Sequence, residues 1–264
     1  MKHVISIIFL LLTLQVSAQD SLSKKISETI SLGTKLYRLE KSNWYAVSVY
    51  AASPENRNNV GGYFSYMQKD STICVFFSRD QDPHIIATVS FDSTYNTETA
   101  KLIAKNRSFT TFENQLFLMR NEAFVRVYGD TSFVKYPKTN LNLIPLIENG
   151  QRKVYVLCEP KQNGVVIFGN DFILDINTDN KIEKTTALHK EFIQVPFANE
   201  EAGSDSTHHI HIPGEGQLYT ATDICTLLLY EDLAHWKIHS LVTQDYVSTW
   251  DCTKQTLQVV PVKK

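Results

Sequence analysis

The fold class is indicated by residues 63–91, which read YFSYMQKDSTICVFFSRDQDPHIIATVSF. Aromatic and β-branched residues fill three runs of this stretch, and clusters rich in Asp, Lys, Ser and Pro separate the runs. Such an arrangement is typical of strands joined by short turns. We expect strands at Tyr63–Gln68, Thr72–Ser78 and His84–Phe91, with a similar run, Trp44–Tyr50, ahead of them. The sequence therefore predicts an antiparallel meander.

Two helices are expected to flank the meander. Apolar residues recur every four positions from Leu22 to Ile30, which predicts an amphipathic helix over Asp20–Leu36. From Thr110 onward apolar residues again recur at steps of three and four, and Thr110 with Glu113 has the pattern of a capping box. A helix of about four to five turns should begin there and pack on the sheet.

A polar segment from Tyr136 to Asn142 is the best candidate for a domain boundary. Beyond it we expect a short strand at Val154–Cys158. A long hairpin should follow, in which Val165–Ile176 pairs with Ile182–Val195 through a turn at residues 177–180.

The last part of the chain is expected to mix strands with one helix. An exposed loop is predicted from Ala198 to Thr207, a helix from Ala221 to Leu233, and closing strands near Ile238–Thr243 and Tyr246–Cys252. The predicted class is α+β, mainly antiparallel. The expected divisions are a leader (1–18), a meander-plus-helix domain (19–140) and a second α+β domain (141–264).

The first 18 residues have the pattern of a secretory signal peptide. A basic start precedes the apolar run Val4–Leu12, and Val16–Ala18 offers small residues for cleavage before Gln19. No Cys stands at this cleavage site, so no lipid anchor is indicated. No later apolar stretch approaches the roughly 20 residues of a transmembrane helix. We therefore expect an exported protein, periplasmic or secreted, with no transmembrane segment.

Composition excludes several classes of partner and protein. One of the 26 Lys and Arg residues lies in the leader, which leaves 25 against 28 Asp and Glu. This balance, without a basic block, makes nucleic acid and anionic membranes poor partners. A hydrophobic content of 43%, with 11% aromatics, excludes a disordered chain.

Four widely spaced cysteines, Cys74, Cys158, Cys225 and Cys252, form no CxxC pair. An oxidising compartment permits disulfides, but a chain of this size folds without them. Disulfides and buried free thiols are both compatible with the sequence.

The segment richest in chemistry holds three of the seven histidines that follow the leader: His208, His209 and His211. In an extended strand, residues i and i+2 point to the same face, so His209 and His211 can present two imidazoles to one ion. Two imidazoles suit zinc, and a catalytic zinc site normally has three protein ligands. The nearest candidate for the third is Asp223, at the start of the following helix.

This pattern resembles the metal motif of the JAB/MPN (JAMM) metalloprotease superfamily, H-x-H followed by S/T-x-x-D. The resemblance covers roughly Val154 to Cys252 and implies a JAMM-like α+β fold there. It implies that His209, His211 and Asp223 bind zinc and that Thr220 helps to stabilise an oxyanion. An upstream Glu activates the zinc-bound water in that family.

Glu159 is the best candidate for this base, and Gln162 competes with it. The family's Glu commonly stands just ahead of an apolar strand that ends in Gly, and the corresponding strand here is Val165–Gly169. By that count the nearest position is Gln162, which cannot take a proton from water. The chain also has one residue more than usual between the second His and the Asp.

Ordinary structural roles compete with these assignments. An H-x-H pattern is also typical of a polar surface strand, and Thr220 with Asp223 is also a plain helix N-cap with an acid in the first turn. The remaining histidines of the mature chain are expected to be structural: His84, His189, His235 and His239.

Two functional hypotheses follow. The first is an exported JAMM-like zinc hydrolase that cleaves an amide or isopeptide bond in a peptide or protein of the cell envelope. The alternative is a catalytically inactive JAMM-like module with a binding or structural role. The chain contains no G-x-S-x-G elbow, glycine-rich phosphate loop, HExxH motif or EF-hand loop.

Overall fold

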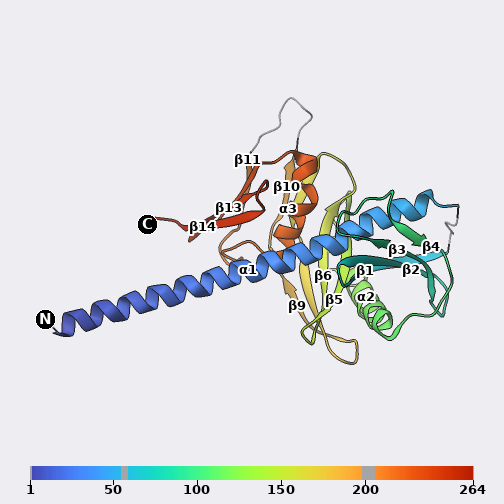
Figure 1. The fold of residues 1–264 in the computed structure, drawn as a ribbon, viewed down its shortest axis with the longest axis horizontal. Helices are drawn as coiled ribbons and strands as arrows, with labels where there is room; N and C mark the ends of the chain where they lie inside the picture. The colour runs from blue at the N-terminus through green and yellow to red at the C-terminus, as the bar shows by residue number, and fades with distance from the viewer. Residues whose placement is uncertain (1, 55–58, 198–205, 264) are drawn as a thin grey trace.

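The computed structural model describes residues 2–54, 59–197 and 206–263. In these ranges three helices and fourteen strands form an α+β fold (Figure 1). All strand pairs named in this part of the chain are antiparallel except β11 with β12. The predicted fold class is therefore confirmed.

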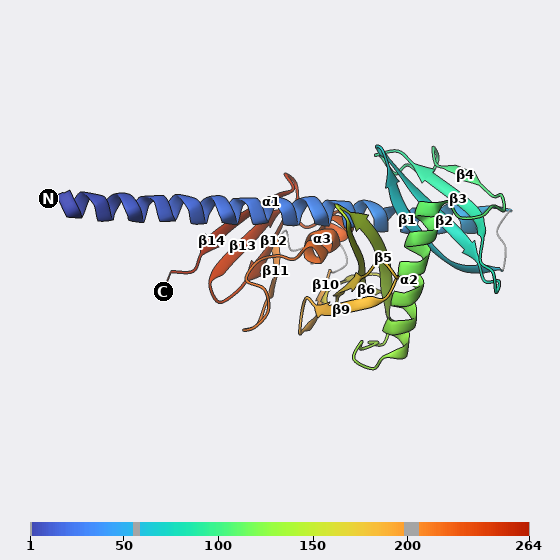
Figure 2. The same ribbon diagram turned by 90° about the horizontal axis from the view of Figure 1, so that it is seen from below.

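Helix α1 (Lys2–Ala52) runs along the long axis of the molecule, beside α3 and on to the first sheet (Figures 1 and 2). The predicted helix Asp20–Leu36 lies within it, but the predicted strand Trp44–Tyr50 is wrong, because that segment continues the helix. The buried positions of this part recur at steps of three and four, which is one face of a helix. Five buried residues follow this spacing, namely Leu36, Leu39, Asn43, Ala46 and Tyr50, and Glu40 and Ser42 are buried beside them.

The first sheet is the predicted meander. Its strands are β1 (Val60–Gln68), β2 (Ser71–Ser78), β3 (Ile85–Phe91) and β4 (Lys101–Ile103), paired in that order. Helix α2 (Thr111–Gly129) follows, and its N-cap is the expected capping box. The Thr110 hydroxyl accepts the backbone N–H of Glu113 at 3.2 Å, while the Glu113 carboxylate accepts that of Thr110 at 2.8 Å.

The second sheet has the order β5-β6-β8-β9. Its strands are β5 (Thr139–Glu148), β6 (Gln151–Pro160), β8 (Phe172–Ile176) and β9 (Ile182–Ala187). The hairpin of β8 with β9 turns at residues 177–181, close to the expected position. Strand β5 begins inside the segment expected to be a boundary.

The predicted long hairpin is interrupted on both sides. Strand β7 (Val165–Gly169) leaves the second sheet and pairs with β10 (Phe192–Pro196). The interruption follows from backbone conformation, because Gly169 has a φ of 89° and Asn170 a φ of 54°. Two consecutive left-handed residues cannot continue a strand.

The last sheet has the order β11-β12-β13-β14, and α3 (Ala221–Ala234) lies between β11 and β12 in the chain. Its strands are β11 (Ser206–Ile210), β12 (Ile238–Val242), β13 (Tyr246–Asp251) and β14 (Thr256–Pro261). The helix, β12 and β13 agree with the sequence prediction, and β14 was not predicted. Of the predicted loop Ala198–Thr207, residues 198–205 lie outside the described ranges, and the prediction is wrong for Ser206 and Thr207, which begin β11 and pair with β12.

The apolar cores extend across residue 140. Met119 and Ala123 of α2 pack with Leu141 and Val154 of the second sheet. In another core, Leu36 and Leu39 of α1 pack with residues of α3 and the last sheet.

All four cysteines are buried free thiols. No helix in the described ranges combines the length and the hydropathy that a bilayer-spanning segment requires.

Candidate metal centre

Strand alternation turns two histidines inward at the end of β11. His209 is 2% exposed and His211 4%, whereas Ile210 between them is 51% exposed and His208 is also exposed. Pairing with β12 extends to His211, whose N–H donates to the Val242 carbonyl at 3.1 Å. The expected placement of His209 and His211 on one face is therefore confirmed.

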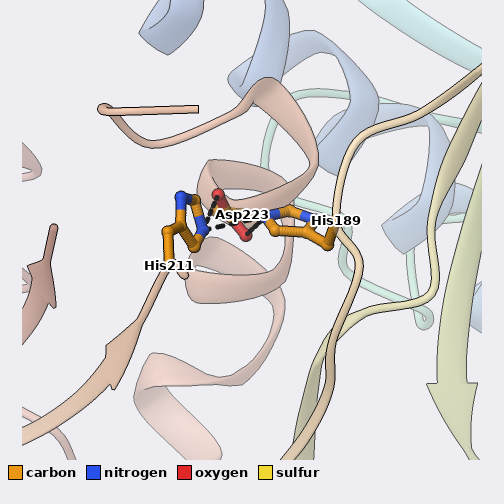
Figure 3. Close-up of side chains that lie close together, drawn as sticks. All are labelled: His189, His211 and Asp223. Atoms are coloured by element: carbon orange, nitrogen blue, oxygen red, sulfur yellow. Dashed lines mark hydrogen bonds and ion pairs between the residues drawn. The ribbon is translucent and has the colours of Figure 1, made fainter. Parts of the chain in front are cut away.

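Three buried side chains bring potential ligand atoms together: His189, His211 and Asp223. One atom from each lies within 4.8 Å of the others, so the group could hold a metal ion. The Nε2 atoms of His189 and His211 are 2.9 Å apart. The Asp223 carboxylate lies 3.3 Å from His189 Nε2 and 3.8 Å from His211 Nε2. Figure 3 shows the carboxylate between the two rings.

Each member comes from a different element. His211 follows β11, Asp223 lies in the first turn of α3, and His189 lies between β9 and β10. The capping box of α3 fixes the carboxylate, because Asp223 Oδ2 accepts the backbone N–H of Thr220 at 2.8 Å and its hydroxyl at 2.9 Å.

The far sides of both imidazoles are held as well. His211 Nδ1 donates to the Gly216 carbonyl at 2.8 Å, and His189 Nδ1 donates to Asp171 Oδ1 at 2.5 Å. Asp171 in turn accepts a hydrogen bond from the Thr222 hydroxyl. Both rings thus direct Nε2 toward Asp223, and a carbonyl or carboxylate behind a ligating imidazole is the usual outer shell of a metal site.

His209 adjoins the group without belonging to it. Its Nε2 is 3.3 Å from His211 Nε2, and its Nδ1 is 2.8 Å from His239 Nε2. The ring stacks on Phe168 with centroids 4.4 Å apart. His209 is therefore placed to be a fourth ligand or a neighbour of the centre.

In the protein alone, burial and neighbouring charges shift the pKa values of His189 and Asp223 in opposite directions. Burial would lower the pKa of His189, but the carboxylates of Asp223 and Asp171 raise it to about 11. Burial would raise the pKa of Asp223, and His189 foremost holds it well below its usual range. Burial lowers the pKa of His209 to about 4 and that of His239 further below its ordinary value. A protonated His189 between two carboxylates is thus the arrangement without an ion.

The other predicted site residues lie apart from this group. The Thr220 hydroxyl caps α3 and bonds Asp223 and Thr222. The buried Glu159 carboxylate accepts the Trp44 indole N–H at 3.2 Å, and it also accepts Asn142. Among the described residues, no hydrogen bond or ion pair joins Glu159 or Gln162 to the cluster. Both residues line a separate pocket at the end of β6 and the loop after it.

Sequence reasoning missed His189, which was expected to be structural. It stands 22 positions before His211, outside the H-x-H pattern. A single His between two strands does not by itself indicate a metal site. The position of His189 depends on the pairing of β7 with β10.

No protein-family model matches this chain, and no significant similarity to a curated protein or to a solved structure was found.

Proposed function

We propose that this chain is an exported zinc-binding protein in which the ion ties three elements together through His189, His211 and Asp223. The observation that carries the proposal is the convergence of two Nε2 atoms and one carboxylate in a buried position. A set dominated by imidazole suits zinc among the common metal ions.

The spacing of the ligand atoms supports a tetrahedral ion. Ligand atoms at about 2.0–2.1 Å from zinc, arranged tetrahedrally, lie about 3.3 Å from one another. The three contacts here are 2.9, 3.3 and 3.8 Å. His209 Nε2 lies 3.3 Å from His211 Nε2, and it would take the fourth position only if its ring moved toward His189 and Asp223 when the ion bound.

Burial supports a structural role for the ion. The side chains of His189, His211 and Asp223 are between 1% and 3% exposed. Structural zinc sites are closed by four protein ligands, whereas catalytic sites keep one position open. The ion would join the last sheet and α3 to the segment between β9 and β10, and the chain would then act as a binding or structural module of the envelope.

Metal analysis of the purified mature chain tests the proposal. We expect about one zinc per chain, a lower melting temperature after chelation, and loss of zinc in His189→Ala and His211→Ala. An ion present at a thousand times its Kd stabilises the fold by about 4 kcal/mol. The matched control is His208→Ala, on the same strand but facing outward, which should keep its zinc.

Absence of stoichiometric metal, with a melting temperature that chelation leaves unchanged, would overturn the proposal. The cluster would then be a metal-free network in which a protonated His189 is held between Asp171 and Asp223.

The second candidate is the JAMM-like zinc hydrolase. The observation in its favour is that His211 and Asp223, two of the three ligands implied by the resemblance, meet at one point. Hydrolysis of isopeptide- or peptide-linked substrates by the zinc-loaded chain, lost in Asp223→Asn and in Glu159→Gln, would support it. Activity retained in Glu159→Gln would exclude Glu159 as the base.

A further inference from the structure

A second polar site lies between α1, α2 and β5. It is a pocket of about 210 Å³, ample for a small solute, since one water needs roughly 10–15 Å³. Its polar walls come from α1, β1, α2 and β5, and none of the residues belongs to the metal centre. They are Glu40, Asn43, Tyr63, Arg120, Asn140 and Asn142.

One wall carries the buried carboxyl group of Glu40, which interacts with that of Glu159. Glu40 is 1% exposed and accepts the amides of Asn43 and Asn142, each at 2.9 Å. The same Asn142 amide also donates to Glu159, which is 7% exposed. Burial raises the pKa of both acids, and the two groups interact directly. Two carboxyl groups in such contact can share one proton, which would leave one negative charge on the pair.

The same pocket is also lined by a cation, the guanidinium of Arg120. Arg120 lies on α2 with its guanidinium 5.5 Å from the centre of the Phe77 ring. Its Nε is buried and has no hydrogen-bond partner. Within the described part of the chain no ion pair includes Arg120. A guanidinium offers several donors in a planar fork that matches a carboxylate.

We propose that this pocket binds a small zwitterion of the α-amino-acid class. The ligand's carboxylate would pair with Arg120, and its ammonium would bond Glu40, whose oxygens keep free lone pairs beside the Asn donors. A pocket lined by both a carboxyl group and a guanidinium suits a solute that carries both charges. The volume restricts the ligand to a small one.

Calorimetric titration of the full mature chain, loaded with whatever metal it carries, tests this site. The probes are the standard L-amino acids one at a time, with propionate and ethylamine as singly charged analogues. We expect at least one small amino acid to bind at least about tenfold more tightly than either analogue, which is about 1.4 kcal/mol. No binding by any amino acid at millimolar concentration, or equal binding of propionate, would overturn the proposal.

Variants locate the site. Arg120→Gln and Glu40→Gln should each weaken binding by at least about tenfold. The matched control is Arg126→Gln on the same helix, since Arg126 is half-exposed and pairs with Asp130 at 3.3 Å. Unchanged affinity in Arg120→Gln would place the ligand elsewhere. Should Arg120→Gln fail to fold, Arg120→Lys keeps the charge without the fork, and the selectivity of the wild-type chain still decides the outcome.

Discussion

Glu113 shows how much one side chain can join in this molecule. Its side chain is 1% exposed. The carboxylate accepts a hydrogen bond from each terminal nitrogen of Arg107 at 2.7 Å, and it also caps α2. The Tyr66 hydroxyl donates to it from β1 at 3.0 Å. Burial alone would raise the pKa of Glu113, but the hydrogen bonds from Arg107 and Thr110 outweigh burial and lower it to about 2.

Acid should therefore destabilise the fold through Glu113. A pKa lowered in the folded state contributes stability that is fully present above the ordinary value of 4.5 and is lost as pH falls toward 2. Thermal unfolding followed from pH 6 to pH 2 should show a smaller acid-induced decrease of the melting temperature in Glu113→Gln than in the wild type. Glu98→Gln, at an exposed turn, is the control; a wild-type acid profile in Glu113→Gln would contradict the prediction.

Gly169 ends β7 with a left-handed backbone and lies against the segment that carries His189. A Cβ at this position would lie 2.0 Å from the Glu191 carbonyl oxygen and 3.4 Å from His189 Cβ, and the φ of 89° strains any other residue. We expect Gly169→Ala to cost at least about 1–3 kcal/mol and to lower zinc content. Gly129→Ala, where a Cβ meets nothing within 4 Å, should do neither, as urea unfolding and metal analysis can show.

The difference between His211 and His189 shows what a single sequence can reveal of a site. Two-residue alternation is a local property, so the inward face of His209 and His211 follows from the sequence of β11. The position of His189 depends on the break at Gly169 and Asn170 and on strand pairing between β7 and β10. Such long-range pairing has no counterpart in the residues next to His189.

At the scale of elements, α1 and α3 approach each other closely at Gly33. A Cβ there would lie 2.5 Å from Ile224 Cβ and 2.9 Å from the Ala221 carbonyl oxygen. Gly33→Ala should therefore separate the helices and destabilise the fold by about 1–3 kcal/mol, despite the better helix propensity of Ala. Ser31→Ala, at an exposed position of α1, is the control. If Gly33→Ala and Ser31→Ala have the same free energy of unfolding in a chemical denaturant, the helices can move apart without loss of stability, and the prediction is wrong.

The segment Trp44–Tyr50 shows why one element was assigned incorrectly. Its aromatic and β-branched residues favour a strand on propensity alone. In the structure the burial of Asn43, Ala46 and Tyr50 extends the helical face that begins at Leu36, and packing overrides propensity. The capping boxes at Thr110 and Thr220 lie at helix starts, where local signals suffice, and the helices they begin were expected from the sequence.

The whole molecule depends on α1. Leu36 and Leu39 are at most 1% exposed and pack in the core that contains α3, while Ala46 and Tyr50 pack in the core of the meander. A chain that begins at Leu141 loses these contacts and those of Met119 and Ala123 with the second sheet. We expect it to show no cooperative thermal transition by circular dichroism. A cooperative transition with full zinc content would mean that residues 141–264 fold independently.

The contact of α1 with α3 also sets the order of events in folding. The ribosome makes Leu36 long before Ile224, yet the two residues share one core. Closing so long a stretch of chain costs entropy before any contact repays it, so folding should be slow and complete only after α3 is made. Until then Leu36 and Leu39 of α1 lack their partners on α3, and exposed apolar residues of this kind are what chaperones bind. In a protein built in this way the core between α1 and α3 stays unformed until α3 has been made, so a chain that ends before α3 would lack it.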